Sequence, residues 1–110
     1  MAEEFKNKTL DVTSSAQSIY TCPAATTAIV ITLRVTNVDG TAADQITAEV
    51  NDSSETLVAE IAHTMTVPAG SSLELAGTSK IVLEEGDDIE LTGVAASGDL
   101  EAFISVLEIS

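Results

Sequence analysis

Four carboxylates surround one glycine in LEEGDDIEL, residues 83–91. Clustered carboxylates can bind a metal ion or work as a general acid and base, and they also occur in solvated turns. The flanking letters KIVL and IEL have the pattern of strands, so residues 84–88 form the connection between them. Gly86 can supply a positive φ there, and consecutive residues of a short connection point their side chains apart rather than toward one ion. The stretch therefore predicts a solvated turn, with adventitious calcium as the alternative and no buried cleft for catalysis.

The sole cysteine and the sole histidine, Cys22 and His63, are the other candidates for catalysis. Cys22 stands in TCP beside an apolar segment, which indicates a small buried side chain rather than a catalytic thiolate. His63 stands in EIAHTMTV without a second metal ligand, and we expect it to be partly buried and hydrogen-bonded to the backbone. The sequence contains no G-x-S-x-G elbow, phosphate-binding loop or dinucleotide fingerprint. We therefore expect no enzymatic activity, no metal site and no cofactor.

The 110 residues carry 18 Asp and Glu against four Lys and Arg, which gives a net charge of −14. This charge disfavours nucleic acid as a partner, and an aromatic content of 3% offers few platforms for stacking bases. It is also large enough for self-repulsion, which indicates saline surroundings or a basic docking partner. No apolar run approaches the ~18 residues of a membrane span, and the opening MAEEFKNK does not have the form of a signal peptide. We expect a soluble protein that is made in the cytosol and does not enter a membrane.

Short runs rich in Thr, Val and Ile, separated by Gly, Pro, Asn and Asp, predict β-strands along the chain. The predicted strands are residues 8–13, 17–22, 28–37, 45–51, 60–67, 72–75, 80–83, 89–95 and 100–109. Eight or nine short strands with regular turns indicate a sandwich or a jelly roll. The predicted fold class is all-β, a single-domain antiparallel β-sandwich that is jelly-roll-like. Residues 1–16 would form an N-terminal arm and first strand, and residues 17–110 the sandwich.

Alternation along the strands assigns side chains to an inner and an outer face. In residues 28–37 it leaves Val30 out of phase and predicts four core residues: Ile29, Ile31, Leu33 and Val35. The last strand is apolar on both faces, with Leu100, Ile104 and Val106 on one and Phe103, Leu107 and Ile109 on the other. We expect the first face to pack on the second sheet and the other face to be buried against a neighbouring subunit, which predicts an oligomer.

Arg34 and the N-terminal segment supply further candidates for a docking surface. Arg34 lies in the most apolar strand, where it pairs with a cross-strand acid such as Glu49 or contacts an acidic partner, and the intramolecular pair is favoured. The first eight residues are either a frayed terminus or an arm that docks on another protein. The predicted partner-interface residues are Phe5, Lys6, Lys8, Arg34, Phe103, Leu107 and Ile109.

Four segments, taken in order, resemble small β-rich virion proteins of tailed bacteriophages: SIYTCPAATTAIVITLRVTNVDGTAAD, VPAGSSLEL, IVLEEGDDIEL and SGDLEAFISVLEIS. The resemblance implies a non-enzymatic protein that decorates or cements the head, often as a homotrimer at three-fold positions. Its partner would be the major capsid protein, and its location the capsid surface of the virion. The alternatives are a neck, tail or fibre protein of the virion and a free module that binds carbohydrate or a surface receptor.

Overall fold

Nine β-strands form two antiparallel sheets in the computed structural model, which describes residues 2–76, 80–94 and 99–110. The strands are β1 (Glu3–Val12), β2 (Gln17–Thr21), β3 (Thr27–Asn37), β4 (Asp44–Asp52), β5 (Leu57–Val67), β6 (Ser72–Glu74), β7 (Ile81–Leu83), β8 (Asp88–Gly93) and β9 (Leu100–Ile109). Sheet A contains β1, β9, β3, β6 and β7, and sheet B contains β2, β8, β4 and β5. Within the described ranges there is no helix that could cross a membrane. The predicted all-β sandwich is confirmed.

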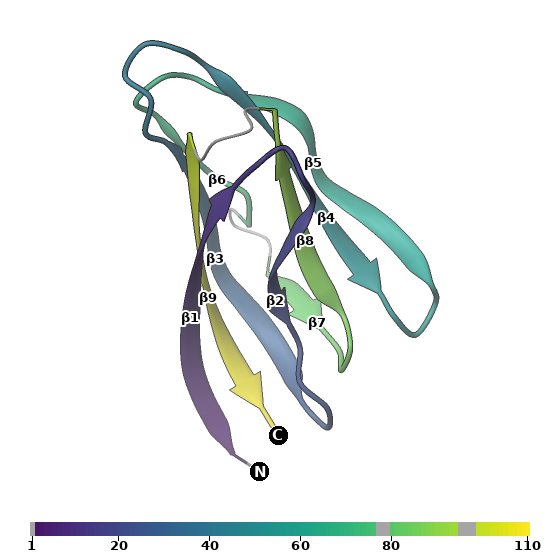
Figure 1. Ribbon diagram of the computed structural model, residues 1–110. Helices are drawn as coiled ribbons and strands as arrows, with labels where there is room; N and C mark the ends of the chain where they lie inside the picture. The colour runs from purple at the N-terminus through teal and green to yellow at the C-terminus, as the bar shows by residue number, and fades with distance from the viewer. Residues whose placement is uncertain (1, 77–79, 95–98) are drawn as a thin grey trace.

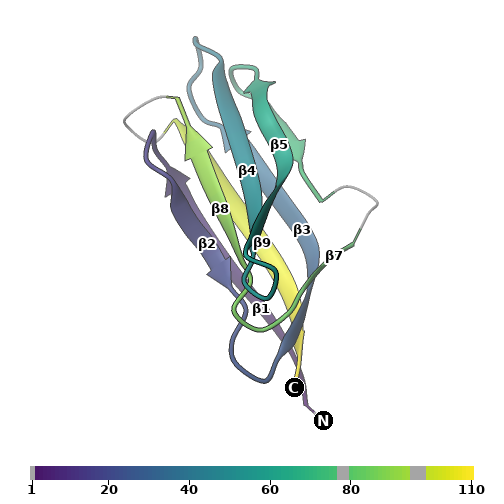
Figure 2. The same cartoon turned by 90° about the vertical axis from the view of Figure 1, so that its right-hand side faces the viewer.

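The strands pair as they do in a jelly roll. β6 and β7 both pair with β3, so together they act as one interrupted strand. The partners are then β1 with β9, β2 with β8, β3 with β6 and β7, and β4 with β5, the nested pairs of one long antiparallel ribbon. Folding this ribbon over itself also places β9 beside β3 and β8 beside β4, which gives the two packed sheets of Figures 1 and 2.

Aliphatic side chains from both sheets fill the space between them. The largest fully buried ones in sheet A are Val12, Val30, Leu33, Val35, Leu83, Leu100, Ile104 and Val106, and those in sheet B are Ile46, Val67, Ile89 and Leu91. Along β9 the burial alternates from residue to residue, as expected for a strand with one face on the core. The predicted assignment of Leu100, Ile104 and Val106 to the inner face is confirmed.

The predicted core face of β3 is half wrong, because a β-bulge changes its phase. Val30 pairs with Val106 and Thr32 with Ser105, so Ile31 is an extra residue in β3. Beyond the bulge Leu33 and Val35 are fully buried, as predicted. Before the bulge the phase is reversed: Val30 is fully buried, whereas Ile31 is 38% exposed. A period-2 pattern read straight through the bulge therefore puts Ile29 and Ile31 on the wrong face.

The N-terminal segment is an edge strand of sheet A. β1 pairs with β9 without interruption from Glu3 to Val12, and it begins well before residue 8, where the sequence pattern places its start. The amide groups of Ala2 and Ser110 exchange two hydrogen bonds of 2.9 Å, so the two ends of the described chain lie side by side (Figure 1). The first residues are thus fixed in the sheet. The predicted end of another strand at Ala95 lies outside the described residues.

Candidate functional site

An uninterrupted row of apolar side chains crosses the outer face of sheet A. In the strand register Phe5 lies opposite Leu107, Leu107 opposite Ile29, and Ile29 opposite Val82. Cross-strand partners point to the same face of a sheet, so these four residues on β1, β9, β3 and β7 form one band, here called the apolar row. It faces away from sheet B, because the neighbouring residues Val30 and Val106 are the buried ones.

The most exposed members of the apolar row have little contact with the rest of the chain. The side chains of Phe5 and Val82 are 74% and 57% exposed, and Leu107 and Ile29 are partly buried by their neighbours. Phe103, two rows further along β9, is 40% exposed. Both phenylalanines of the chain therefore lie outside the core, although a buried phenylalanine contributes about 1.5–3 kcal/mol to folding. Exposed apolar side chains gathered in this way mark a candidate interaction surface on the outer face of sheet A.

Arg34 lies on this same outer face, between Phe103 on β9 and Glu74 on β6. The predicted pair with Glu49 is wrong, because Glu49 belongs to β4 in the other sheet. The carboxylate of Glu74 accepts hydrogen bonds from the Thr32 hydroxyl and from the backbone N–H of Leu33, the latter at 2.8 Å. Arg34 lines a shallow hollow of about 430 Å³ together with Phe103.

Two of the predicted interface residues, Lys6 and Lys8, lie on the opposite face of β1, the one turned toward sheet B, and both remain exposed at the edge of the sheet. They are register partners of Val106 and Ile104, which face the core. The Nζ atom of Lys6 lies 3.0 Å from Oε1 of Glu108, and the Nζ atom of Lys8 lies 5.7 Å from the ring centre of Tyr20. Both lysines therefore fasten the edge strand β1 to the sandwich.

Glu108 and Tyr20 join the two sheets at the end of the sandwich where the chain termini lie. The Tyr20 hydroxyl donates a 2.5 Å hydrogen bond to Oε2 of Glu108, and both side chains are buried. The hydrogen bond from Tyr20, followed by that from Lys6, lowers the pKa of Glu108. Burial, followed by the Glu108 carboxylate, raises the pKa of Tyr20. Sequence reasoning missed this pair, and the one signal for it was an acid at an inward position of the last strand.

The outer face of sheet B has a different character. Glu49 lies opposite Glu60 on one side and opposite Glu90 on the other, so three glutamates on β5, β4 and β8 form a cross-strand row, here called the glutamate row. Like charges directly opposite one another destabilise a sheet. Asn51 offsets part of this by donating a 2.9 Å hydrogen bond to Glu90, and Glu60 accepts one from His63.

The acidic turn of residues 84–88 is only partly the solvated turn that the sequence predicts. Gly86 has φ = +85°, as expected, and a Cβ atom there would lie 2.7 Å from Oγ of Ser53. Asp87, however, is 4% exposed. Its carboxylate accepts hydrogen bonds from the backbone N–H of Ser53 and of Glu84, both at 3.0 Å, and thereby fastens the β4–β5 turn to the β7–β8 turn.

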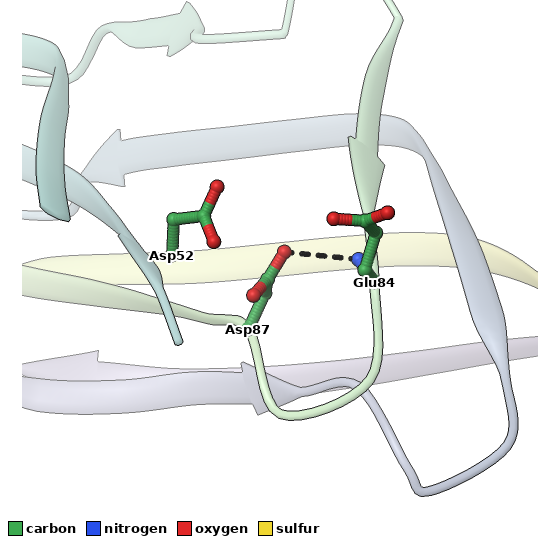
Figure 3. Close-up of side chains that lie close together, drawn as sticks. All are labelled: Asp52, Glu84 and Asp87. Carbon is green, nitrogen blue, oxygen red and sulfur yellow. Dashed lines mark hydrogen bonds between the residues drawn. The ribbon is translucent and has the colours of Figure 1, made fainter. Parts of the chain in front are cut away.

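The prediction that these side chains all splay apart is wrong for Glu84 and Asp87. Together with Asp52 they place carboxylate oxygens within 4.8 Å of one another, and Figure 3 shows the three side chains around a common space. Oxygens at this spacing could ligate a divalent cation. The hydrogen bonds of Asp87, and those that Asp52 accepts from the amide and hydroxyl of Ser54, already account for the arrangement. The turn cluster is thus a structural fastening.

Cys22 and His63 lie in different parts of the molecule. Cys22 is 2% exposed and its Sγ donates to the carbonyl oxygen of Thr26 at 3.3 Å, which agrees with the predicted buried side chain, and burial raises the pKa of its thiol. The prediction that His63 is partly buried and bonded to the backbone is wrong. It is exposed on β5, where its Nδ1 lies 2.7 Å from Oε2 of Glu60. Bulges in β5, with Thr64 at φ = +43°, turn this histidine outward.

Comparison with known proteins gives the fold and no family. No family model matches the chain, and no curated protein matches it. One similar solved structure is a protein of Bacillus endospore appendages, which form a novel family of disulfide-linked pili. It matches with a TM-score of 0.58 and 16% sequence identity, over 99% of this chain and 87% of the Bacillus chain. At this identity the two chains share the architecture of an all-β sandwich.

Proposed function

We propose that the protein is a non-enzymatic structural subunit of a bacteriophage virion that decorates the head and cements neighbouring major capsid proteins. The observation that carries the proposal is the apolar row, with Phe5 and Val82 exposed on the outer face of sheet A. Apolar area of this kind gains its stability when another surface covers it. The sequence resemblance to virion proteins supplies the identity of that surface, the shell.

The rest of the molecule is consistent with a passive role. The hollows on the described surface are shallow, and the single cysteine and single histidine lie apart, one in the core and one on an exposed edge strand. The buried carboxylates Asp44, Asp87 and Glu108 are all hydrogen-bonded within the fold. Binding energy shared over many copies on one lattice would stabilise the shell by mass action.

The proposal is tested by asking whether the protein binds to phage heads and makes them more resistant to rupture. Heads purified from a phage that encodes this chain, with its gene deleted, should rupture at a lower temperature or after a milder osmotic shock than wild-type heads. Adding back the purified protein should restore resistance, and gel densitometry should find it in numbers comparable to the capsid protein. Unchanged resistance, or only a handful of copies per particle, would favour a neck or tail position over cementing.

A second candidate is a subunit of an extracellular filament, which the structural likeness to a pilus protein favours. The Bacillus pili are disulfide-linked, whereas the one cysteine of this chain, Cys22, is buried. A filament of this protein would therefore have to be held by non-covalent contacts. Negative-stain microscopy of the concentrated protein at high salt separates the two candidates: filaments support the second, and single particles that bind heads support the first.

A further inference from the structure

Acidic groups flank the apolar row at both ends of the outer face of sheet A. Toward one end, Asp11 and Glu101 lie opposite each other on β1 and β9, six residues along each strand from the row, or about 20 Å. Toward the other end, Glu3 lies opposite Ile109, two residues along each strand from the row. The face is therefore an apolar band with an acidic pair on one side and a single acidic residue, Glu3, on the other.

Asp11 and Glu101 line a surface hollow that also includes the aromatic residue Phe103. Arg34, Thr9 and Thr36 line it as well. Two like charges placed directly opposite across a strand pair destabilise the sheet by themselves. A cation that enters between them relieves this repulsion and can also stack on the exposed Phe103 ring.

We propose that the outer face of sheet A docks a partner protein that covers the apolar row with apolar side chains and places lysine or arginine against the acidic residues on either side of it, Asp11 with Glu101 and Glu3. This inference deepens the function proposed above, since it states the chemistry of the capsid surface that would receive the face. The favoured partner surface is an apolar ridge with basic residues about 7 Å beyond it on one side and about 20 Å beyond it on the other, the strand distances to Ile109 and to Glu101.

Charge argues against a second copy of this chain as the occupant. Each copy carries a net charge of −14, so two copies repel one another, and a face-to-face pair would bring two sets of the same acidic residues together. A basic partner is instead attracted by the whole molecule and held by the acidic residues on either side of the row. A homotrimer, if one forms, would use another surface.

The test places a photo-activated cross-linker, p-benzoylphenylalanine, at one of two matched valines. Val82 is 57% exposed in the apolar row, and Val58 is 58% exposed on β5 of sheet B, so the two sites differ in face and not in accessibility. Cells producing phage are illuminated during assembly, and the cross-linked peptides are sequenced. We expect the Val82 variant to give one dominant product with another protein, at a peptide with lysine or arginine near the apolar contact, and at least about tenfold more product than the Val58 variant.

A pair of double charge reversals then tests the acidic pair. Asp11→Lys with Glu101→Lys, and Glu49→Lys with Glu60→Lys, each convert a cross-strand acid pair to a lysine pair and each change the net charge from −14 to −10. Long-range attraction is thus altered equally. The yield of the Val82 cross-link should fall about tenfold or more in the first variant and less than about twofold in the second.

The outcomes separate the inference from the proposed function. Products between two copies of this chain, no product at Val82, equal yields from Val58, or a partner peptide without basic residues would each overturn the inference. An apolar and basic partner peptide that comes from a protein outside the virion would uphold the inference and defeat the proposed function. A peptide of the major capsid protein with this chemistry would support both.

Discussion

The two outer faces of this sandwich have the same backbone geometry and opposite surfaces. Across sheet A the apolar row sets Phe5, Leu107, Ile29 and Val82 side by side, and across sheet B the glutamate row sets Glu60, Glu49 and Glu90 side by side. Both rows run perpendicular to the strands. The apolar row is stabilised when a partner covers it. The glutamate row is stabilised by contact with water and salt.

This difference is what we expect if the outer face of sheet A makes the contact proposed above and the outer face of sheet B stays in solvent. A row of glutamates at strand spacing repels any acidic surface, including another copy of sheet B, and so disfavours stacking of the protein on itself. Bulges in the edge strand β5 add to this effect, because they interrupt the regular hydrogen-bonding edge. In the assembly that we propose, sheet A would face the shell and sheet B the solvent.

The strongest challenge to the comparison is to test which residues of β3 belong to the outer face. Leu33→Ala removes a fully buried side chain and should lower the free energy of unfolding by about 2–5 kcal/mol. Ile31→Ala, at the bulge, should cost about 1 kcal/mol or less because Ile31 is partly exposed. Urea denaturation of the two variants measures this. Equal losses would mean that the bulge is absent and that the outer face is not the one described.

The next largest effect concerns binding. Val82→Glu puts a charge at the β7 end of the apolar row and should weaken docking on phage heads about 100-fold or more, because the contact would bury an unpaired carboxylate. The matched change Val58→Glu on sheet B should alter it less than about threefold. Co-sedimentation with heads measures both. If the two variants bind equally well, sheet A is not the docking face.

A third measurement tests whether the contact of Glu108 with Tyr20, which joins the two sheets, still stabilises the protein at low pH. The pKa of Glu108 is lowered by Tyr20 and Lys6, so its contribution to stability is full above the unfolded value near 4.5 and is lost as the pH falls through the lowered folded value. Glu108→Gln should cost about 1–2 kcal/mol at pH 7 and progressively less below pH 4.5. Unfolding of wild type and variant between pH 3 and 7 tests this. A difference that is independent of pH would contradict it.

The smallest expected effect is a gain. Glu49→Gln removes the central charge of the glutamate row and should raise the free energy of unfolding at low salt by about 0.2–1 kcal/mol. Because the repulsion is screened, the gain should shrink in 0.5 M NaCl, where the Debye length is about 4–5 Å. Thermal denaturation at both salt concentrations measures it. A gain that salt does not reduce would have to come from another source.

Much of the fold could be predicted from the sequence, because strand residues alternate and turn residues separate them. The last strand could be assigned to both faces correctly, since it contains no bulge. The faces of β3 could not, because the apolar run Ile29–Ile31 breaks the alternation without showing which residue is the extra one, and the register with β9 decides that. Two of the four residues of the apolar row, Phe5 and Leu107, were among the interface residues predicted from the sequence. Ile29 and Val82 joined it only through the register between strands far apart in the chain.

The charged groups were harder to place. Lys6 and Lys8 have the spacing of one strand face, and nothing in the sequence says whether that face is inner or outer. Tyr20, on the other sheet, is the hydrogen-bond partner of Glu108, and Lys6 pairs with the same carboxylate from the side of β1 that faces sheet B. The sequence pattern makes Asp87 a solvated turn residue, since its partner Ser53 lies 34 positions away in the sequence. Polar contacts of this kind join residues that are far apart in the sequence. They depend on the strand topology, so they cannot be predicted from the local sequence pattern.

The nearness of Ala2 to Ser110 also bears on how the chain reaches its fold. The pairing of β1 with β9 joins residues at opposite ends of the sequence, and such non-local pairing slows folding because a long loop must close first. A few glycines joining Ser110 to Ala2, with a new opening in the exposed turn between Ser14 and Ser15, would make β9 and β1 a local hairpin. The permuted chain would keep both outer faces, and we expect it to fold faster than the natural order.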